Sequence, residues 1–431
     1  MPNQVYIIGA GAAGCFCAIA LKRMNAHMEV TVVERGTRPL RKLAITGGGR
    51  CNLTNSFSEV RSLKQVYPRG EKLMKRLLKE FSQHDTMAWF ENEGIPLTTQ
   101  PDQCVFPRSQ DAMQIVDTLQ ILMRRAGVKV VCNCDAFAKG SMQQITGRNS
   151  DEAFVTAWLK EQAEHLTTGQ VEDRPSTQQT ALVIATGTPH SDTLRLFFAP
   201  YGIKVTPTLP SLFTFCLGDE ALHALMGTVV EHVVVRLTGT KWQAEGALLI
   251  THWGFSGPAI LRLSSYAAVH LASSDYQAEL AVNWLGGARE DEAADLLQHL
   301  AAAYPQRLLA NQHPPQLMQR HWVYLLQKAG LSPQKRWQEL GPKQTARLAS
   351  LICCDLYKVT GRGENKEEFV TCGGIALDNL NPSTLECRHL PHLYFAGEVC
   401  DVDAVTGGFN LQAAWTMGYV VARSIAQLPA S

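Results

Sequence analysis

Three glycines near the N-terminus have the spacing of a loop that binds the pyrophosphate of a dinucleotide. Gly9, Gly11 and Gly14 follow the apolar run Val5–Ile8 directly. The first glycine allows a tight turn, the second lets the backbone approach the phosphates, and the third lets a helix pack against the sheet. The helix expected over Ala12–Met24 directs its free N–H groups and positive dipole end at the phosphates. The expected contacts are Gly9, Gly11, Ala12, Ala13 and Gly14.

A second apolar run, Val30–Val33, ends in Glu34, twenty residues after Gly14. A carboxylate here accepts hydrogen bonds from ribose hydroxyls and repels a 2′-phosphate. We include Glu34 and the adjacent Arg35 among the expected cofactor contacts. The alternative is a glycine turn without a ligand, but strand, helix, second strand and acid are all in place. The motif therefore predicts an adenine dinucleotide, without deciding between FAD and NAD.

The C-terminal segment favours FAD. Residues 393–414 predict a strand, an acidic turn, a glycine pair and a long helix. An acid at the strand end can hold ribityl hydroxyls, and a helix N-terminus can stabilise negative charge on the N1–C2=O edge of a reduced flavin. NAD has neither group. The contacts expected from this segment are Gly397, Glu398, Asp401, Gly408, Asn410 and Leu411.

A third glycine-rich segment spans Arg41–Asn55. Its glycines expose backbone N–H groups, and its cations add positive charge, which suits a loop that crosses a pyrophosphate and reaches a flavin ring. The alternative is an ordinary flexible loop. The contacts expected here are Lys42, Gly48, Gly49, Arg50, Cys51 and Asn52. Thr186 and Gly187, after the apolar run Ala181–Ala185, complete the expected cofactor site.

The order of the elements indicates an α/β fold. Strand and helix signals alternate up to about residue 190, as in a doubly wound parallel sheet. β segments and then three helices follow, and strand signals return near Phe369. We therefore expect three parts: a Rossmann-like FAD-binding domain over residues 1–190 and 365–431, a β-barrel-like inserted domain over 191–288 and 350–364, and a helical insert over 289–349.

Composition narrows the function classes. The chain has 431 residues, of which 45% are hydrophobic, and a formal net charge of +1. This balance argues against nucleic-acid and membrane partners, and no apolar run is long enough to span a bilayer. The twelve cysteines show neither CxxC nor zinc spacing, so we expect no metal and a reduced, cytoplasmic protein. The oligomeric state cannot be inferred.

One segment departs from this charge balance. Between Tyr304 and Arg347 there are seven Lys or Arg residues and one acid, Glu339. A solvated helical face is the simpler interpretation. The alternative is a binding site for an anionic ligand such as a nicotinamide dinucleotide.

Several long motifs resemble a known family. They are Thr46–Asn55 (TGGGRCNLTN), Val105–Pro107 with Ser109, Thr251–Pro258 (THWGFSGP), Val370–Ile375 and Gly397–Gln412. Nearly the whole chain resembles the BaiN-type (YhiN-like) NAD(P)/FAD-dependent oxidoreductases, which are related to aminoacetone oxidase. The resemblance implies FAD in a Rossmann-like domain that is interrupted by a flattened β-barrel carrying a small helical insert.

The resemblance indicates the cofactor better than the substrate. Family members have been assigned the reduction of unsaturated 3-oxo bile-acid intermediates and the oxidation of aminoacetone. Two features depart from the family pattern: the loop that follows Gly187, and Cys400 in place of an aliphatic residue. A redox pair of Cys51 and Cys400 is conceivable, although disulfide reductases of this fold carry two cysteines on one element.

His252 is the candidate catalytic residue, because an imidazole in a glycine-containing turn can donate a proton near neutral pH. The alternative is a packed histidine.

The leading hypothesis is an FAD-dependent oxidoreductase that reduces a small, enone-like molecule through flavin N5, with NADH or NADPH as transient reductant. One alternative is an aminoacetone-like amine oxidase that uses O₂. A second is an FAD-binding, nucleic-acid-associated protein that uses the basic insert.

Overall fold

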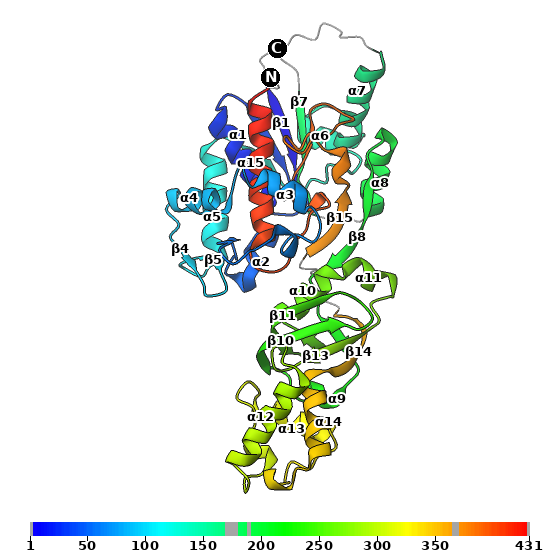
Figure 1. The fold of residues 1–431 in the computed structure, drawn as a ribbon. Coiled ribbons are helices and arrows are strands. Elements are labelled where there is room, and N and C mark those ends of the chain that lie inside the picture. The colour runs from blue at the N-terminus through cyan, green and yellow to red at the C-terminus, as the bar shows by residue number, and fades with distance from the viewer. Residues whose placement is uncertain (1–2, 169–179, 188–190, 364–369, 429–431) are drawn as a thin grey trace. The chain divides into compact units, whose positions relative to one another are not determined.

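The computed structural model of the chain describes residues 3–168, 180–187, 191–363 and 370–428. It divides into two compact units, which are described separately below (Figure 1). The first unit comprises Met1–Thr208 and Thr371–Ser431, and the second comprises Leu209–Val370. The second unit is thus inserted into the first, and β8 (Val205–Ser211) pairs with β15 (Val370–Ile375) where the chain leaves and returns.

A five-stranded parallel sheet forms the centre of the first unit. The strand order is β16-β7-β1-β2-β6. The strands are β1 (Gln4–Ile8), β2 (Glu29–Val33), β6 (Lys129–Val131), β7 (Thr180–Ile184) and β16 (Leu393–Phe395). Four of them are almost continuously apolar and buried, as expected where helices cover both faces of a parallel sheet. The predicted doubly wound α/β domain is confirmed.

Two helices from opposite ends of the chain pack side by side in this unit: α1 (Ala12–Met24) and α15 (Phe409–Ala426) (Figure 1). Gly418 makes the close approach possible, because a Cβ atom there would lie 2.6 Å from the Ala13 carbonyl oxygen. The other helices are α2 (Arg41–Gly49), α3 (Glu71–Leu77), α4 (Gln83–Asn92), α5 (Ala112–Arg125), α6 (Ser141–Thr146), α7 (Phe154–Thr168) and α8 (Ser191–Phe198). A small sheet contains β3 (Thr54–Asn55), β5 (Cys104–Pro107) and β4 (Leu97–Thr99).

The first unit extends beyond the domain boundary that we expected at residue 190. The structure places the division after Thr208. The Phe198 ring contacts Phe395 with 5.4 Å between ring centroids, and the Lys204 ammonium lies 2.9 Å from the Asp378 carboxylate. These contacts hold α8 and the following segment against the Rossmann-like part.

The second unit contains a closed six-stranded barrel, in the order β10-β11-β12-β9-β14-β13. The strands are β9 (Phe215–Leu217), β10 (Val229–Leu237), β11 (Gln243–Ile250), β12 (Gly254–Ser256), β13 (Ala278–Asn283) and β14 (Asp355–Arg362). Short helices α9 (Glu220–His223), α10 (Pro258–Tyr266) and α11 (Ala268–Ser273) accompany them. Closure leaves no unpaired sheet edge in the barrel, and the β-barrel prediction is confirmed.

The helical insert continues the core of this barrel. Its helices are α12 (Glu290–Ala303), α13 (Gln319–Lys328) and α14 (Pro342–Cys353). One cluster of buried apolar residues runs from barrel strands into these helices and includes Phe255, Leu325 and Leu348. The barrel and the insert are therefore one folding core.

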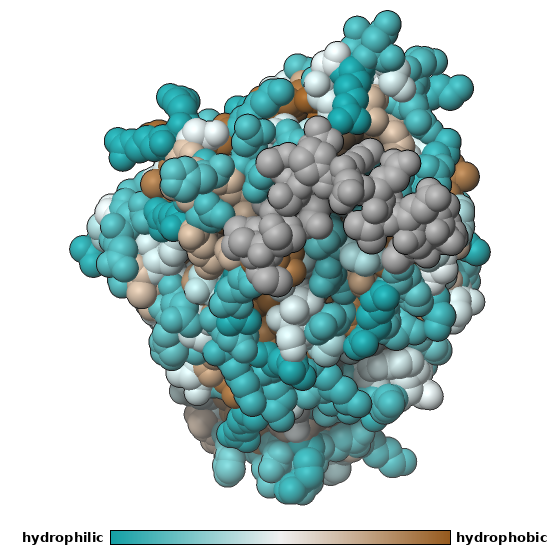
Figure 2. Space-filling view, turned by 90° about the horizontal axis from the view of Figure 1, so that it is seen from above, coloured by the Kyte–Doolittle hydropathy of each residue, from teal (hydrophilic) through white to brown (hydrophobic). Residues whose placement is uncertain are grey.

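Within the described residues, no helix has both the length and the apolar character needed to cross a membrane. The face of the molecule in Figure 2 is largely hydrophilic, and its apolar residues form small separate patches.

Candidate functional site

Four of the predicted cofactor residues lie at one edge of the sheet of the first unit. Gly9, Glu34, Thr186 and Gly397 each follow the carboxyl end of a strand: β1, β2, β7 and β16, respectively. These four strands are neighbours in parallel register, so their carboxyl ends lie at the same edge. Open α/β sheets bind their ligands at this edge.

The first loop has the tight packing that its glycines predict. A Cβ atom on Gly9, whose φ is +109°, would lie 2.5 Å from the Ala185 carbonyl oxygen. One on Gly14 would lie 2.0 Å from the Gly9 carbonyl oxygen, so α1 packs directly on the turn. A Cβ on Gly11, the N-cap of α1, would meet nothing within 4 Å. The N-terminus of α1 therefore faces open space in which a phosphate can approach its N–H groups.

Glu34 holds this loop in place. Its carboxylate accepts hydrogen bonds from the backbone N–H of Ala10 at 2.9 Å and of Gly36 at 2.7 Å. Each carboxylate oxygen has a second lone pair, which can accept from a ribose hydroxyl. Arg35, the next residue, is exposed.

The glycine-rich segment Arg41–Asn55 is partly helical, which corrects the expectation of a loop. Residues 41–45 form the helical part of α2, and the backbone leaves the helix at Thr46. Gly47, Gly48 and Gly49 then have φ angles of +59°, +68° and +82°, and a Cβ on Gly48 or Gly49 would meet nothing within 4 Å. These consecutive left-handed glycines expose backbone N–H groups, as an anion-binding loop requires.

Asn52 joins this loop to the C-terminal motif. With its side-chain amide oriented to satisfy both groups, Asn52 donates to the Thr54 carbonyl oxygen at 3.0 Å and accepts from the Gly408 N–H at 3.2 Å. Gly408 is the N-cap of α15 and has no room for a side chain, since a Cβ would lie 2.3 Å from the Thr54 carbonyl oxygen. Two motifs more than 350 residues apart thus meet at the N-terminus of α15.

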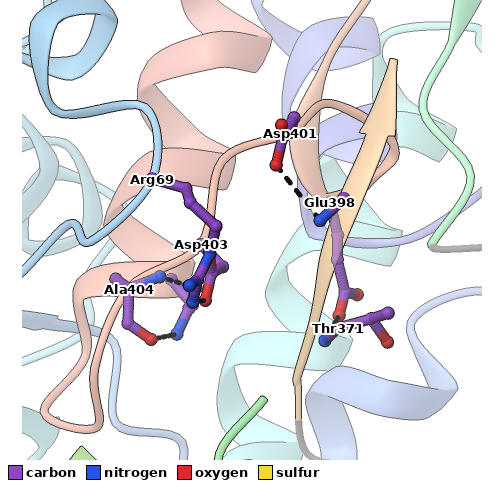
Figure 3. A network of polar contacts seen from close by, with 8 residues as sticks. Arg69, Thr371, Glu398, Asp401, Asp403 and Ala404 are labelled. Atoms are coloured by element: carbon purple, nitrogen blue, oxygen red, sulfur yellow. Dashed lines mark hydrogen bonds and ion pairs between the residues drawn. The ribbon is translucent and has the colours of Figure 1, made fainter. Parts of the chain in front are cut away.

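Glu398 and Lys42, both predicted cofactor contacts, form an ion pair with each other. The shortest distance between the Lys42 ammonium and the Glu398 carboxylate is 2.8 Å. Glu398 also accepts from the Thr371 N–H at 3.1 Å, and Asp401 accepts from the Gly373 N–H at 3.1 Å (Figure 3). The two acids therefore tie the C-terminal turn to β15.

Arg69 and Asp403 also support this turn, and the sequence analysis assigned neither of them a role. The Arg69 guanidinium donates to both carboxylate oxygens of Asp403, whose side chain is completely buried (Figure 3). A bidentate pair of this kind fixes geometry as well as charge. No local pattern could have shown it, because 334 residues separate the partners.

Asn410 and Leu411 have mainly local surroundings. The Asn410 amide accepts from the Ala404 N–H at 2.9 Å and donates to the Ala404 carbonyl oxygen at 2.8 Å, which closes the turn before α15. Leu411 is half-buried in the first turn of that helix. Arg50 is exposed, and its guanidinium carbon lies 4.6 Å from the centroid of the Phe106 ring.

Thr186 provides a test of whether this site fits FAD. Its hydroxyl oxygen is buried and has no hydrogen-bond partner among the residues that the structure describes. A Cβ added to the next residue, Gly187, would lie 3.7 Å from the Glu398 carboxylate, so this end of β7 lies beside the C-terminal turn. A buried hydroxyl without a partner is costly unless a ligand or water satisfies it. This hydroxyl, together with the open space beside Gly11, Gly48 and Gly49, fits a bound dinucleotide, which has many polar groups.

The cysteines near the site are unreactive. All twelve are free, and Cys51 and Cys400 are buried. Burial raises the pKa of the Cys51 thiol to about 12 and that of Cys400 still further. Thiols of this kind are not nucleophiles at neutral pH. Among the described residues no cluster of three or more His, Cys, Asp or Glu could hold a metal ion.

His252 belongs to the second unit. It lies in the turn between β11 and β12, where the Thr251 hydroxyl accepts from the N–H groups of Trp253 and Gly254, both at 3.2 Å. The His252 and Trp253 side chains are exposed, with 4.6 Å between ring centroids. The turn thus holds two aromatic rings at the surface, so His252 is not a packed core histidine.

Comparison with known proteins finds relatives that match nearly the whole chain. A family model described as the HI0933-like protein Rossmann domain matches residues 3–424. A ribosomal RNA dihydrouridine synthase of Escherichia coli (strain K12) is 29% identical, with 97% of each chain covered. A 3-dehydro-bile acid delta(4,6)-reductase of Clostridium scindens is 26% identical over 99% of this chain and 100% of the relative. Among solved structures, a 3-ketosteroid delta1-dehydrogenase from Sterolibacterium denitrificans has 12% identity and a TM-score of 0.45, covering 98% of this chain and 99% of that one.

Proposed function

We propose that this chain, which belongs to the HI0933-like family of FAD-dependent oxidoreductases, reduces a carbon–carbon double bond conjugated to a carbonyl group. The observation that carries the proposal is the contact between Asn52 and Gly408, which joins two glycine-rich segments at the N-terminus of α15. This junction suits the flavin end of FAD, because backbone N–H groups and a helix N-terminus converge there.

The names of the two relatives support this class of substrate. A dihydrouridine synthase makes a uracil whose C5=C6 bond, conjugated to a carbonyl, has gained two hydrogens. A delta(4,6)-reductase of a 3-dehydro-bile acid acts on double bonds conjugated to a ring ketone. Both substrates have an electron-poor carbon β to a carbonyl, which accepts hydride. We transfer this shared chemistry, rather than either substrate, to the present chain.

Bound FAD supplies the hydride chemistry, and the residues described above hold and orient it. The N-terminus of α1 and the glycines at 47–49 would receive the pyrophosphate, and Glu34 the adenosine ribose. Glu398 and Thr186 offer polar atoms to the ribityl chain, and the N-terminus of α15 would stabilise negative charge on the flavin edge.

Reduction of an enone also requires a proton for the carbon next to the carbonyl. We assign this proton to His252, because its imidazole is exposed and an imidazole can serve as a general acid. The adjacent Trp253 ring, 44% exposed, offers a flat apolar surface to a conjugated substrate. The backbone that carries both side chains is held by the Thr251 hydroxyl, which accepts from the Trp253 N–H.

NADH or NADPH is the proposed electron donor. The sequence contains one dinucleotide fingerprint, which FAD would occupy, so nicotinamide and substrate would use the same flavin face in turn. This order predicts ping-pong kinetics, with parallel lines in double-reciprocal plots.

A small enone and a uracil base in RNA both satisfy the proposed chemistry. An RNA substrate would reverse our initial expectation that nucleic acid is not a partner.

The test begins with the visible spectrum of the purified protein under anaerobic conditions. We expect a flavin band that bleaches with NADH or NADPH and returns when a 3-oxo-4-ene steroid or a uridine-containing RNA is added. Mass spectrometry should then show two added hydrogens in the product. A protein that binds no FAD, or a reduced flavin that only O₂ reoxidises, would contradict the proposal.

A further inference from the structure

A series of buried hydrogen bonds runs along helix α15. The Thr54 hydroxyl donates to the side-chain carbonyl oxygen of Gln412 at 2.5 Å. The Gln412 amide nitrogen donates to the Thr416 hydroxyl oxygen at 3.0 Å, and that hydroxyl donates to the Phe81 carbonyl oxygen at 2.9 Å. Thr54, Gln412 and Thr416 are completely buried. We call these three residues the α15 polar network.

The network joins α15 to the segment that follows the glycines at 47–49. Thr54 of this segment belongs to the network. The preceding residue, Leu53, accepts through its carbonyl oxygen from the Trp415 indole N–H at 3.0 Å. Asn52, one residue earlier, accepts from the N–H of the helix N-cap. Three consecutive residues therefore hold the first two turns of α15 against the glycine-rich segment.

Stability alone does not explain polar side chains at these positions. A buried amide or hydroxyl gives up its hydrogen bonds to water and gains little net free energy from the bonds that replace them. Apolar side chains of the same shape would fill the space with nearly the same stability. Hydrogen bonds are directional, however, and a fully satisfied network fixes one arrangement of its members. The α15 polar network thus sets the rotation and axial position of the helix.

The position of α15 determines the electrostatic effect of its N-terminus. The first hydrogen bond of the helix runs from the Gln412 N–H to the Gly408 carbonyl oxygen at 3.0 Å. The N–H groups of residues 409–411 precede this bond and have no acceptor within the helix. They stabilise a nearby negative charge together with the helix dipole, and the effect falls off within one turn. A small shift of the helix would therefore weaken it.

We propose that Gln412 is a positioning residue that holds the N-terminus of α15 at the flavin edge and thereby raises the reduction potential of bound FAD. The inference rests on the proposed function, because it takes FAD as the cofactor of this site. Reduction by two electrons and one proton leaves one negative charge on the N1–C2=O edge of the flavin, so a helix N-terminus there favours the reduced form. Gln412 acts through the helix, since its side chain is buried between Thr54 and Thr416.

The test uses variants of the full chain that keep side-chain size. Gln412→Met removes the amide and keeps the length and helix propensity of the side chain. Thr416→Val breaks the network at its next bond, whereas Thr416→Ser keeps the hydroxyl. The control is Asn379→Leu. Asn379 carries a buried amide in the same unit, and its hydrogen bonds go to Lys204 and Ala376, neither of which belongs to α15.

Two quantities are measured for each variant. The midpoint potential of bound FAD comes from anaerobic reductive titration against a reference dye. Backbone amide exchange of α15 in the apoprotein is followed by mass spectrometry, which needs no cofactor.

We expect Gln412→Met and Thr416→Val to lower the preference for reduced over oxidised FAD about tenfold, which lowers the potential of a two-electron couple by about 30 mV. Amide exchange in the first two turns of α15 should become faster in both. Thr416→Ser should keep the wild-type potential. Asn379→Leu should also keep it, although this change removes three hydrogen bonds.

A wild-type potential in Gln412→Met would overturn the inference. An equal fall in Asn379→Leu would also overturn it, because the effect would then come from a general loosening of the unit. If Gln412→Met does not fold, the comparison of Thr416→Val with Thr416→Ser decides in the same way. A wild-type protein that takes up no FAD would contradict the proposed function, and unchanged amide exchange in the apoprotein variants would then show that the network does not position α15.

Discussion

Among single residues, Thr186 gives the sharpest test of the cofactor site. Its buried hydroxyl has no hydrogen-bond partner within the described part of the chain, so Thr186→Val should leave the free energy of unfolding of the apoprotein unchanged or raise it by about 1 kcal/mol. The same change should weaken FAD binding about tenfold if FAD satisfies the hydroxyl. Denaturant unfolding of the apoprotein and fluorescence titration with FAD measure the two effects separately.

A second buried threonine supplies the control for this prediction. The Thr228 hydroxyl donates to the Leu225 carbonyl oxygen at 2.6 Å in the second unit. Thr228→Val should therefore lower stability by about 1 kcal/mol and leave FAD affinity unchanged. Unchanged FAD affinity in Thr186→Val would remove this hydroxyl from the cofactor site.

His252 has a natural control in the same unit. His270 is also exposed and also contacts a tryptophan, Trp242, with 4.8 Å between ring centroids. His252→Gln should slow reoxidation of the reduced enzyme by substrate about 100-fold, because a positioned proton donor contributes at least this much. Bleaching by NADH should not change, and His270→Gln should affect neither step. Stopped-flow measurements of both half-reactions decide between a proton donor and a surface histidine.

Helix α13 carries a buried histidine that makes stability depend on pH. His321 is completely buried, both ring nitrogens lack hydrogen-bond partners among the described residues, and its ring centroid lies 4.2 Å from that of Trp284. Burial, with the nearby Lys328 charge adding to it, lowers the pKa of His321 to about 3, from about 6.5 in an unfolded chain. The unfolded state thus binds one more proton between these values. The contribution of neutral His321 to the free energy of unfolding is therefore fully present above pH ~6.5 and is lost as the pH falls below that value.

The expected slope is about 1.4 kcal/mol per pH unit below pH ~6. His321→Phe should flatten this part of the curve, because phenylalanine fills the same space without a titrating group. The exposed His299→Phe should leave the curve unchanged. Urea unfolding of the second unit, followed by tryptophan fluorescence between pH 7 and pH 5, gives the slopes. Equal slopes in His321→Phe and the wild type would contradict the assignment.

Local signals predicted many elements well, because helix ends and apolar runs are encoded within a few residues. The helix over Ala12–Met24 has the predicted bounds. Helix α4 begins after its N-cap Ser82, whose hydroxyl accepts from the Asp85 N–H while the Asp85 carboxylate accepts from the Ser82 N–H.

The site was predictable where a single turn defines it and not where distant segments meet. The glycines and Glu34 at the sheet edge follow from a local motif. The Asn52–Gly408 contact and the Arg69–Asp403 pair join segments separated by hundreds of residues.

At the scale of the whole molecule, the division into units predicts which part folds alone. The second unit, Leu209–Val370, is one continuous segment with a closed barrel and a single core cluster. It buries three tryptophans completely, Trp284, Trp322 and Trp337. The first unit is discontinuous, and all predicted FAD contacts lie in it.

A fragment of residues 209–370 should therefore fold without the rest of the chain, because a closed barrel needs no partner strand and its core of about 160 residues is large enough for cooperative stability. We expect a cooperative urea transition with a red shift of tryptophan emission. The fragment should bind no FAD and keep the acid sensitivity that His321 causes. A non-cooperative transition, or exposed tryptophans in buffer, would mean that the barrel depends on the first unit for its fold.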